Sequence, residues 1–141
     1  PAVRRAVDSF GYDEPGQRER VRVRDDGGFS FRGDPAAIEL VLFNLLKNAL
    51  YYLPLYPAMT VTLTVSAQPS PRIVVRDTGP GIPQEELGRV FDRFYRVPGT
   101  EAPGSGLGLS IAQAAAQRCG MRLSLRNRDD CSGLVARLEC C

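Results

Sequence analysis

Two asparagines one helical turn apart are the first residues whose chemistry needs an explanation. Asn44 and Asn48 lie within residues 34–53, where apolar residues recur every three or four positions and predict one long helix. Asparagine is a poor helix former, and each one in mid-helix costs a few tenths of a kcal/mol relative to alanine. A carboxamide oxygen can help to hold Mg²⁺ without cancelling its charge. The pair therefore suggests a metal–phosphate site, and two asparagines facing solvent are the alternative.

A carboxylate followed by closely spaced glycines ends a predicted buried strand. The strand covers residues 72–77 and ends at Asp77, which is followed by Gly79, Gly81 and Ile82. Glycine has no side chain, so a flat ligand can approach the backbone closely there. A partly buried carboxylate can also accept a hydrogen bond from the exocyclic amine of adenine. A strand end with a tight turn is the alternative interpretation.

A second glycine-rich segment leads directly into an alanine-rich helix. Residues 104–111 are Gly-Ser-Gly-Leu-Gly-Leu-Ser-Ile, and a helix is predicted over residues 107–118. Glycine loops that open a helix offer free N–H groups and the positive end of the helix dipole to phosphate. The segment is not a P-loop, because no Gly-Lys-Ser/Thr follows, and no βαβ unit surrounds it as in a dinucleotide fingerprint. A flexible hinge is the alternative.

The elements that must position these residues follow from the alternation of apolar and polar residues. Helices are expected over residues 1–10, 34–53 and 107–118, strands over 20–24, 29–31, 60–65, 72–77, 121–125 and 134–138, and short helical turns over 85–90 and 91–95. This order predicts an α+β fold, a two-layer α/β sandwich in which helices cover one face of a mixed sheet of about five strands.

Composition excludes several classes of function. The 141 residues contain no histidine, which rules out Ser-His-Asp and Cys-His catalysis and any phosphohistidine within this chain. The net charge of +2 comes from 18 basic and 16 acidic residues spread along the chain, so we expect no nucleic-acid partner. No apolar run approaches the roughly 20 residues of a membrane-spanning helix, and we expect no direct membrane contact from this fragment.

Four motifs in a fixed order give the chain a family resemblance. Residues 44–49 (Asn-Leu-Leu-Lys-Asn-Ala), 77–82 (Asp-Thr-Gly-Pro-Gly-Ile), 91–96 (Phe-Asp-Arg-Phe-Tyr-Arg) and 104–111 resemble the N, G1, F and G2 boxes of the GHKL superfamily. Over roughly residues 20–139 the chain is similar to the catalytic ATP-binding (HATPase_c-type) domain of a sensor histidine kinase. The resemblance implies the Bergerat fold, with ATP and Mg²⁺ as cofactors.

The resemblance also implies a role for each matching residue. Asn48 would coordinate Mg²⁺ and Asn44 would lie near the phosphates, as the catalytic pair, while Asp77 would bind the adenine amino group. Phe91 and Phe94 would anchor the base of the lid over the nucleotide. The other implied nucleotide contacts are Tyr51, Tyr52, Gly79, Gly81, Ile82, Arg96, Gly104, Ser105, Gly106, Leu107, Gly108 and Leu109.

One residue type decides between the activities of the superfamily. Its ATPases place a glutamate general base four residues before the Mg²⁺ asparagine, where this chain has Asn44. An amide cannot take a proton from water, so we expect slow hydrolysis. A neutral histidine nitrogen is already a nucleophile, so the resemblance favours a protein histidine kinase that transfers the γ-phosphate of ATP to a histidine on a separate dimerisation domain.

Departures from the family pattern keep two alternatives open, a nucleotide-binding scaffold without kinase activity and a GHKL-type ATPase. Tyr51 stands where many such kinases have Lys or Arg, and the lid, residues 97–103, contains neither. Ser132, Gly133 and Leu134 stand where relatives often have Gly-Thr.

The expected organisation is that of a fragment. Residues 1–19 are expected to form an N-terminal helix and linker leading from an absent phosphoacceptor domain, and residues 20–141 the catalytic domain. The implied partners are the dimerisation and phosphoacceptor domain of the same kinase and a downstream response regulator. The implied location of this domain is the cytoplasm, and the domain could be part of a membrane-anchored receptor.

Overall fold

A five-stranded mixed sheet forms one layer of the molecule. The computed structural model describes residues 2–12, 16–27, 35–50, 58–67, 70–92, 108–130 and 132–140. The strand order is β1-β2-β3-β5-β4, in which β1 pairs parallel with β2 and all other pairs are antiparallel. The strands are β1 (Val21–Asp25), β2 (Val61–Ser66), β3 (Arg72–Asp77), β4 (Met121–Asn127) and β5 (Leu134–Cys140).

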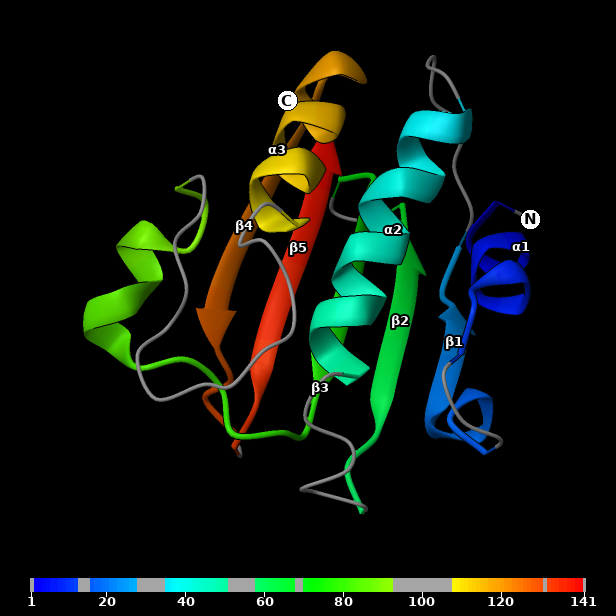
Figure 1. Ribbon diagram of the computed structural model, residues 1–141. Coiled ribbons are helices and arrows are strands. Elements are labelled where there is room, and N and C mark those ends of the chain that lie inside the picture. Colours follow the sequence, from blue (N-terminus) through cyan, green and yellow to red (C-terminus); the bar gives the residue numbers. More distant parts are fainter. Residues whose placement is uncertain are drawn as a thin grey trace.

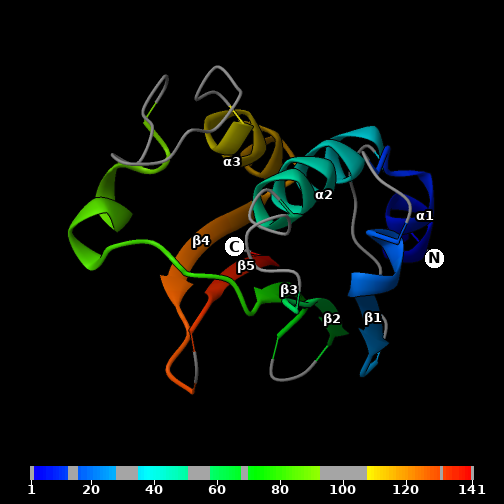
Figure 2. The ribbon, with the colours of Figure 1, turned by 60° about the horizontal axis from the view of Figure 1, so that its bottom comes forward.

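Three helices form the second layer on one face of this sheet (Figure 1). They are α1 (Ala2–Ser9), α2 (Pro35–Leu50) and α3 (Gly108–Arg118). Figure 2, with the lower end of Figure 1 turned forward, shows the helices on one side of the strands. The 3₁₀ helices are η1 (Arg18–Arg20) and η2 (Gln84–Arg89), and η2 lies beyond β4 at the edge of the sheet. The predicted two-layer α+β architecture is confirmed.

Helix α2 is the main source of the core because its apolar stripe faces the sheet. Its buried residues are Ile38, Val41, Leu42, Leu45, Leu46, Ala49 and Leu50, which recur every three or four positions as the sequence predicted. Helix α3 turns Ala112, Ala115 and Ala116 inward, each fully buried. Side chains this small allow α3 to pack closely beside α2, and this contact brings the asparagine-bearing helix next to α3.

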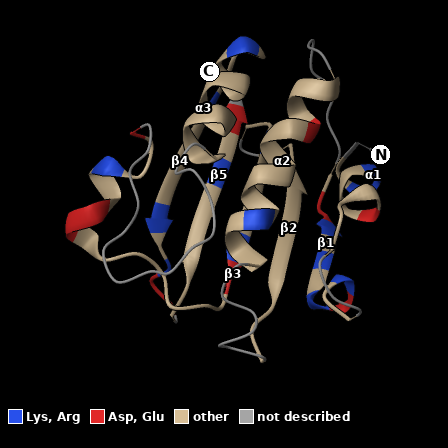
Figure 3. Cartoon of the chain, viewed as in Figure 1, with Lys and Arg blue, Asp and Glu red and all other residues tan. Residues whose placement is uncertain are grey.

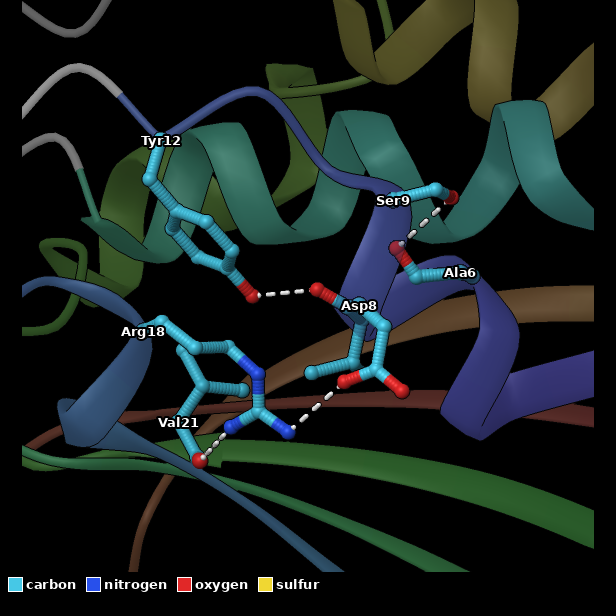
Figure 4. Close-up of polar contacts among 7 residues, drawn as sticks. Ala6, Asp8, Ser9, Tyr12, Arg18 and Val21 are labelled. Atoms are coloured by element: carbon cyan, nitrogen blue, oxygen red, sulfur yellow. Dashed lines mark hydrogen bonds and ion pairs between the residues drawn. The ribbon is translucent and has the colours of Figure 1, made fainter.

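Helix α1 belongs to the same hydrophobic core as the sheet and α2. Val3 and Val7 are buried in it. The Phe10 ring meets the Phe43 ring of α2 edge-on, with ring centroids 5.5 Å apart. In Figure 4 the following segment folds back on the helix: the Tyr12 hydroxyl donates to the Val7 carbonyl oxygen at 2.7 Å.

The guanidinium of Arg18 connects α1 to the sheet. It donates to an Asp8 carboxylate oxygen at 3.0 Å and to the Val21 carbonyl oxygen at 2.9 Å (Figure 4). Because Asp8 belongs to α1 and Val21 begins β1, this residue joins the N-terminal helix to the first strand. The proposed boundary at residue 19 therefore separates two segments that share one core.

Most predicted elements are found within one to three residues of their expected limits. The main helix begins at Pro35, as the proline at the first helical position indicated. The turn expected over 85–90 is η2, and Phe91 packs half-buried against the core. The expected strand over 29–31, the end of the helix over 51–53, and the remainder of the turn over 91–95 lie outside the described residues.

The core assignment predicts different costs for two leucines on α2. Leu46→Ala removes a fully buried side chain and should lower the free energy of unfolding by about 2–5 kcal/mol. Leu40→Ala is the matched control, because Leu40 lies on the same helix and is 37% exposed; it should change stability by about 0.5 kcal/mol at most. Urea unfolding of both variants measures the difference, and equal losses would contradict this placement of α2.

Candidate functional site

Asp77 is a buried carboxylate with one oxygen held and the other available. It is the last residue of β3 and lies on the core-facing side, opposite Val61 of β2. Its side chain is 8% exposed. Its Oδ1 accepts hydrogen bonds from the backbone N–H of Gly79 at 3.0 Å and of Leu134 at 3.2 Å. Within the described residues Oδ2 has no hydrogen-bond partner, so it can accept one from a ligand.

Burial dominates the electrostatics of this carboxylate. It raises the pKa of the Asp77 carboxyl above its ordinary value of 3.8, and the N–H groups of Gly79 and Leu134 and the charge of Arg128 only partly oppose the rise. The ionised form is therefore under-solvated. A ligand that donates a hydrogen bond to Oδ2 would supply part of the missing solvation, which makes Asp77 a recognition group for an N–H donor.

The glycines after Asp77 are required by close contacts. At Gly79 a Cβ atom would lie 3.3 Å from the Asp77 Oδ1 and 3.3 Å from the Met59 methyl carbon. Gly81 has a φ of +75°, and a Cβ there would lie 2.6 Å from the Asn127 Oδ1. Packing against neighbouring protein atoms therefore favours glycine at both positions of this loop.

Asn127 fixes the position of the loop and was not among the predicted site residues. Its Oδ1 accepts the Ile82 N–H at 2.9 Å and its Nδ2 donates to the Ile82 carbonyl oxygen. The side-chain amide thus binds both the N–H and the carbonyl group of one loop residue. The sequence could have indicated this role. The inward positions of β4 are Met121, Leu123, Leu125 and Asn127, so a polar residue occupies a position where the alternation predicts an apolar one.

The hairpin between β4 and β5 supports the same loop from the other side. The Ser132 hydroxyl donates to the Gly79 carbonyl oxygen at 2.7 Å. Gly133 has a φ of +141°, and a Cβ there would lie within 2.0 Å of the Asp77 carbonyl oxygen. The Arg128 side chain donates through Nη1 to that same oxygen at 3.4 Å. The backbone N–H of Arg128 donates to the Gly133 carbonyl oxygen at 2.9 Å. Although this Ser-Gly-Leu sequence departs from the family pattern, Ser132 still supplies a hydroxyl to this region and Leu134 an N–H.

The asparagine pair lies on α2 where α3 begins. Asn44 and Asn48 are both partly exposed. The Asn44 Nδ2 donates to the Leu40 carbonyl oxygen at 2.8 Å. A Cβ on Gly108, the first residue of α3, would lie 3.2 Å from the Asn44 Oδ1. The first asparagine motif and the end of the second glycine segment are therefore in contact, as a shared phosphate site requires.

The described site residues lie at the lower ends of their elements as Figure 1 shows them. The C-terminal half of α2 and the end of β3 lie toward the lower end of the view, and α3 begins higher up, at its own lower end. Leu109 is partly buried against the core. The predicted nucleotide contacts that lie outside the described residues are Tyr51, Tyr52, Arg96, Gly104, Ser105, Gly106 and Leu107, together with Phe94 and the lid.

The side-chain oxygens of Asn44 and Asn48 suit a cation whose remaining ligands are oxygens of water and phosphate. Within the described ranges no group of three or more Asp, Glu or Cys side chains could hold a metal ion. Asn44 and Asn48 offer neutral oxygens, and Mg²⁺ usually takes one or two protein ligands and completes its shell with water and phosphate. The residues present therefore fit Mg²⁺ bound together with a nucleotide. In the described part of the chain no helix is both long and apolar enough to span a membrane.

Comparison with known sequences gives consistent matches. A family model described as histidine kinase-, DNA gyrase B-, and HSP90-like ATPase matches residues 33–138. The chain is 42% identical over 126 residues to the sensor protein QseC of Escherichia coli O157:H7, covering 87% of this chain and 27% of QseC. It is 39% identical over 118 residues to the signal transduction histidine-protein kinase/phosphatase MprB of Mycobacterium sp. (strain KMS), covering 77% of this chain and 23% of MprB. The chain spans about a quarter of the length of these relatives.

Solved structures show the same fold. The mycobacterial sensor histidine kinase MprB superposes with a TM-score of 0.80 at 26% identity, covering 97% of this chain and 91% of that one. The catalytic domain of the histidine kinase ThkA superposes with a TM-score of 0.75 at 25% identity, covering 99% and 90%.

The raised pKa of Asp77 predicts a pH-dependent stability difference. The folded protein holds the Asp77 proton more tightly than the unfolded chain does. The stabilisation is therefore present below the ordinary pKa of 3.8 and is lost as the pH rises through the higher native pKa. Since Asp77→Asn cannot titrate, the free energy of unfolding of the parent minus that of the variant should fall as the pH rises above 3.8. Urea unfolding at a series of pH values measures this difference. Asp92→Asn, an exposed position, is the charge-matched control, and a difference that rises with pH would contradict the burial argument.

The close approach at Gly133 predicts a cost that backbone strain alone does not explain. Gly133→Ala would place a Cβ against the Asp77 carbonyl and should cost about 3 kcal/mol or more. Gly27→Ala is the matched control: its φ of +122° is also positive, but nothing lies within 4 Å of the added atom, so about 1–2 kcal/mol is expected. Thermal or urea unfolding compares them, and similar losses would show that the contact with Asp77 does not matter.

Proposed function

Because the chain belongs to the family of histidine kinase-, DNA gyrase B-, and HSP90-like ATPases, we propose that it is the ATP-binding catalytic domain of a sensor histidine kinase. In this function it transfers the γ-phosphate of ATP to a histidine on a separate dimerisation domain. The observation that carries the choice is Asn44. Its position on α2 faces the start of α3, and it offers an amide, which is not a base.

Adenine recognition falls to Asp77 and the loop that follows it. The free Oδ2 would accept a hydrogen bond from the exocyclic amine of the base, while Oδ1 stays fixed by two N–H groups. Gly79 and Gly81 carry no side chain that would block the base, and Ile82 is held in place by Asn127. The carboxylate accepts hydrogen bonds only, so it favours an amine over a carbonyl at that position of the base.

Phosphate binding falls to α2 and the segment before α3. Asn48 would hold Mg²⁺ through its side-chain oxygen and Asn44 would lie near the phosphates, with the triphosphate beside the N-terminus of α3. The metal ion would neutralise charge on the phosphates. The contribution of this chain is to orient the nucleotide so that its γ-phosphate faces an incoming nucleophile. The roles of Tyr51, Tyr52, Arg96 and residues 104–107 follow from the family resemblance.

The absence of histidine makes a partner obligatory. The chain has no imidazole to phosphorylate, and the relatives it matches are about four times longer. The partner would be a dimerisation domain of the same protein that carries the phosphoacceptor histidine, and a response regulator would receive the phosphate afterwards. The proposed location of this domain is the cytoplasm, where ATP is available.

The first test asks whether Asn48 acts on the phosphates. Asn48→Ala should lower Mg²⁺-dependent phosphotransfer about 100-fold or more and leave the unfolding midpoint nearly unchanged, because Asn48 is only partly buried. Glu39→Ala is the control, an exposed residue on the same helix outside the motif. Turnover that matches the parent in Asn48→Ala would overturn the assignment of this residue.

The second test separates the kinase from its alternatives. The chain is mixed with γ-labelled ATP, with or without a dimerisation domain bearing histidine. Alone it should bind ATP, release phosphate slowly and acquire no label, and with the partner it should give acid-labile, base-stable label on the partner. Joining the two domains raises the effective concentration of the acceptor to roughly millimolar, so transfer should be faster than between separate proteins. Rapid phosphate release by the chain alone would favour an ATPase, and binding without transfer a scaffold.

A further inference from the structure

The face of the sheet that points away from the helices is lined with arginines. The strand register aligns its residues into rows that run across the strands. One row is Arg22, Thr62, Arg76, Val135 and Arg126, the next is Arg24, Thr64, Val74, Arg137 and Ser124, and the third is Ser66, Arg72, Glu139 and Arg122. Seven arginines and one glutamate therefore share this outer face, and the first two rows, here called the arginine rows, contain no acidic residue.

Burial shows that arginine stems cover the middle of this face. Val74 and Val135 are 4% and 3% exposed, although they point away from the helices and do not belong to the main core. Their cross-strand neighbours in the rows include Arg137 and Arg76. Arginine covers apolar surface with its methylene stem while its guanidinium stays in water, so the charged groups form the outermost layer.

The positive charges crowd one another. Burial lowers the pKa of Arg76, and the neighbouring charges of Arg128, Arg126 and Arg137 lower it further. Arg24 and Arg126 each have one ion pair, with Asp26 and Asp129, at 3.0 Å and 3.4 Å. Within the described residues Arg22, Arg76 and Arg137 have none. The charge of Asp130 opposes this effect on Arg76 but is the smallest of the contributions. Crowded like charges destabilise a fold, and this cost points to an external anion.

We propose that the arginine rows form a docking surface for an anionic lipid bilayer, with guanidinium groups bound to lipid phosphates. From the sequence we expected no membrane contact, because no apolar run approaches the length of a membrane-spanning helix. The strand register changes that expectation by placing the charges on one face. Figure 3 shows blue segments along β1, β4 and β5 behind helices that are mostly uncharged.

The shape and composition of the face favour lipid over other polyanions. Five strands about 4.8 Å apart spread the charges over about 19 Å across the sheet, and successive rows spread them further along the strands. This arrangement suits an extended charged plane. The described strand residues of this face include no aromatic side chain, so they lack the platforms that single-stranded nucleic acids stack on. Among the described residues the exposed large apolar side chains are Leu40 and Ile111, both on helices. The arginine rows therefore lack the apolar anchors that usually dominate protein interfaces.

The test compares vesicle binding by two variants of equal net charge. The face variant is Arg22→Gln/Arg76→Gln/Arg137→Gln, which removes no ion pair between described residues. The control variant is Arg4→Gln/Arg5→Gln/Arg118→Gln, exposed positions on α1 and α3. Each chain is sedimented with vesicles of phosphatidylcholine alone or with one third phosphatidylglycerol.

The parent should bind only the vesicles that contain phosphatidylglycerol, and less as salt is raised. The face variant should bind them roughly 100-fold more weakly, since each basic residue near an anionic surface contributes about 1 kcal/mol. The control variant should stay within about threefold of the parent. ATP affinity and the melting temperature of the face variant should match or exceed those of the parent, because repulsion around Arg76 is relieved.

Three results would overturn the proposal. The first is equal binding to neutral and anionic vesicles, and the second is an equal loss in both variants, which would show that only net charge matters. The third is tighter, face-dependent binding to duplex DNA or polyglutamate than to the vesicles, which would assign the surface to a different polyanion. The inference does not depend on the kinase proposal, since vesicle binding is measured without nucleotide.

Discussion

The burial of one carboxylate at the end of β3 constrains much of the surrounding structure. Asp77 lies among core-facing residues, so its Oδ1 must be satisfied by N–H groups that the chain brings to it. One comes from Gly79, two residues on, and the other from Leu134, which lies across the sheet on β5. The second donor reaches Asp77 because β5 pairs with β3, and Gly133 must be glycine to let the strands approach. A local recognition group thus depends on the pairing of strands far apart in sequence.

Local sequence patterns predicted the helices, the strands and the residues at the ends of elements. The apolar stripe of α2, the alternation in β2 and the glycines after Asp77 each express a short-range rule. The supports of the site were missed because they act over 45 to 57 residues of sequence: Asn127 binds Ile82, Ser132 binds Gly79 and Leu134 binds Asp77. Such contacts depend on the register of β5 against β3 and of β4 against β5. Only the interruption of the apolar inward positions by Asn127 was visible beforehand.

The register of the strands also explains why the net charge of the whole chain does not describe the charge on one face. A net charge of +2 describes the average over all faces, whereas a field near a surface depends on which charges share that surface. In β1 the arginines alternate with valines, and in β4 with apolar residues, so every arginine there points outward. Each strand alone is an ordinary amphipathic strand with a solvated face. The charge becomes concentrated only when pairing aligns Arg22, Arg76 and Arg126 in one row.

The choice of an amide at Asn44 fits a domain that must hold ATP while it waits for a partner. A carboxylate at this position would repel the phosphates and could activate a water molecule, so the nucleotide would be hydrolysed before an acceptor arrived. An amide contributes a neutral oxygen, and here its N–H₂ group is engaged by the Leu40 carbonyl oxygen of the preceding turn. That bond turns Oδ1 toward the start of α3, where Gly108 leaves space for it. Under the proposed function, the slow loss of ATP to water follows from the absence of a base at Asn44, and the hydrogen bond to Leu40 orients the Asn44 oxygen for the phosphates.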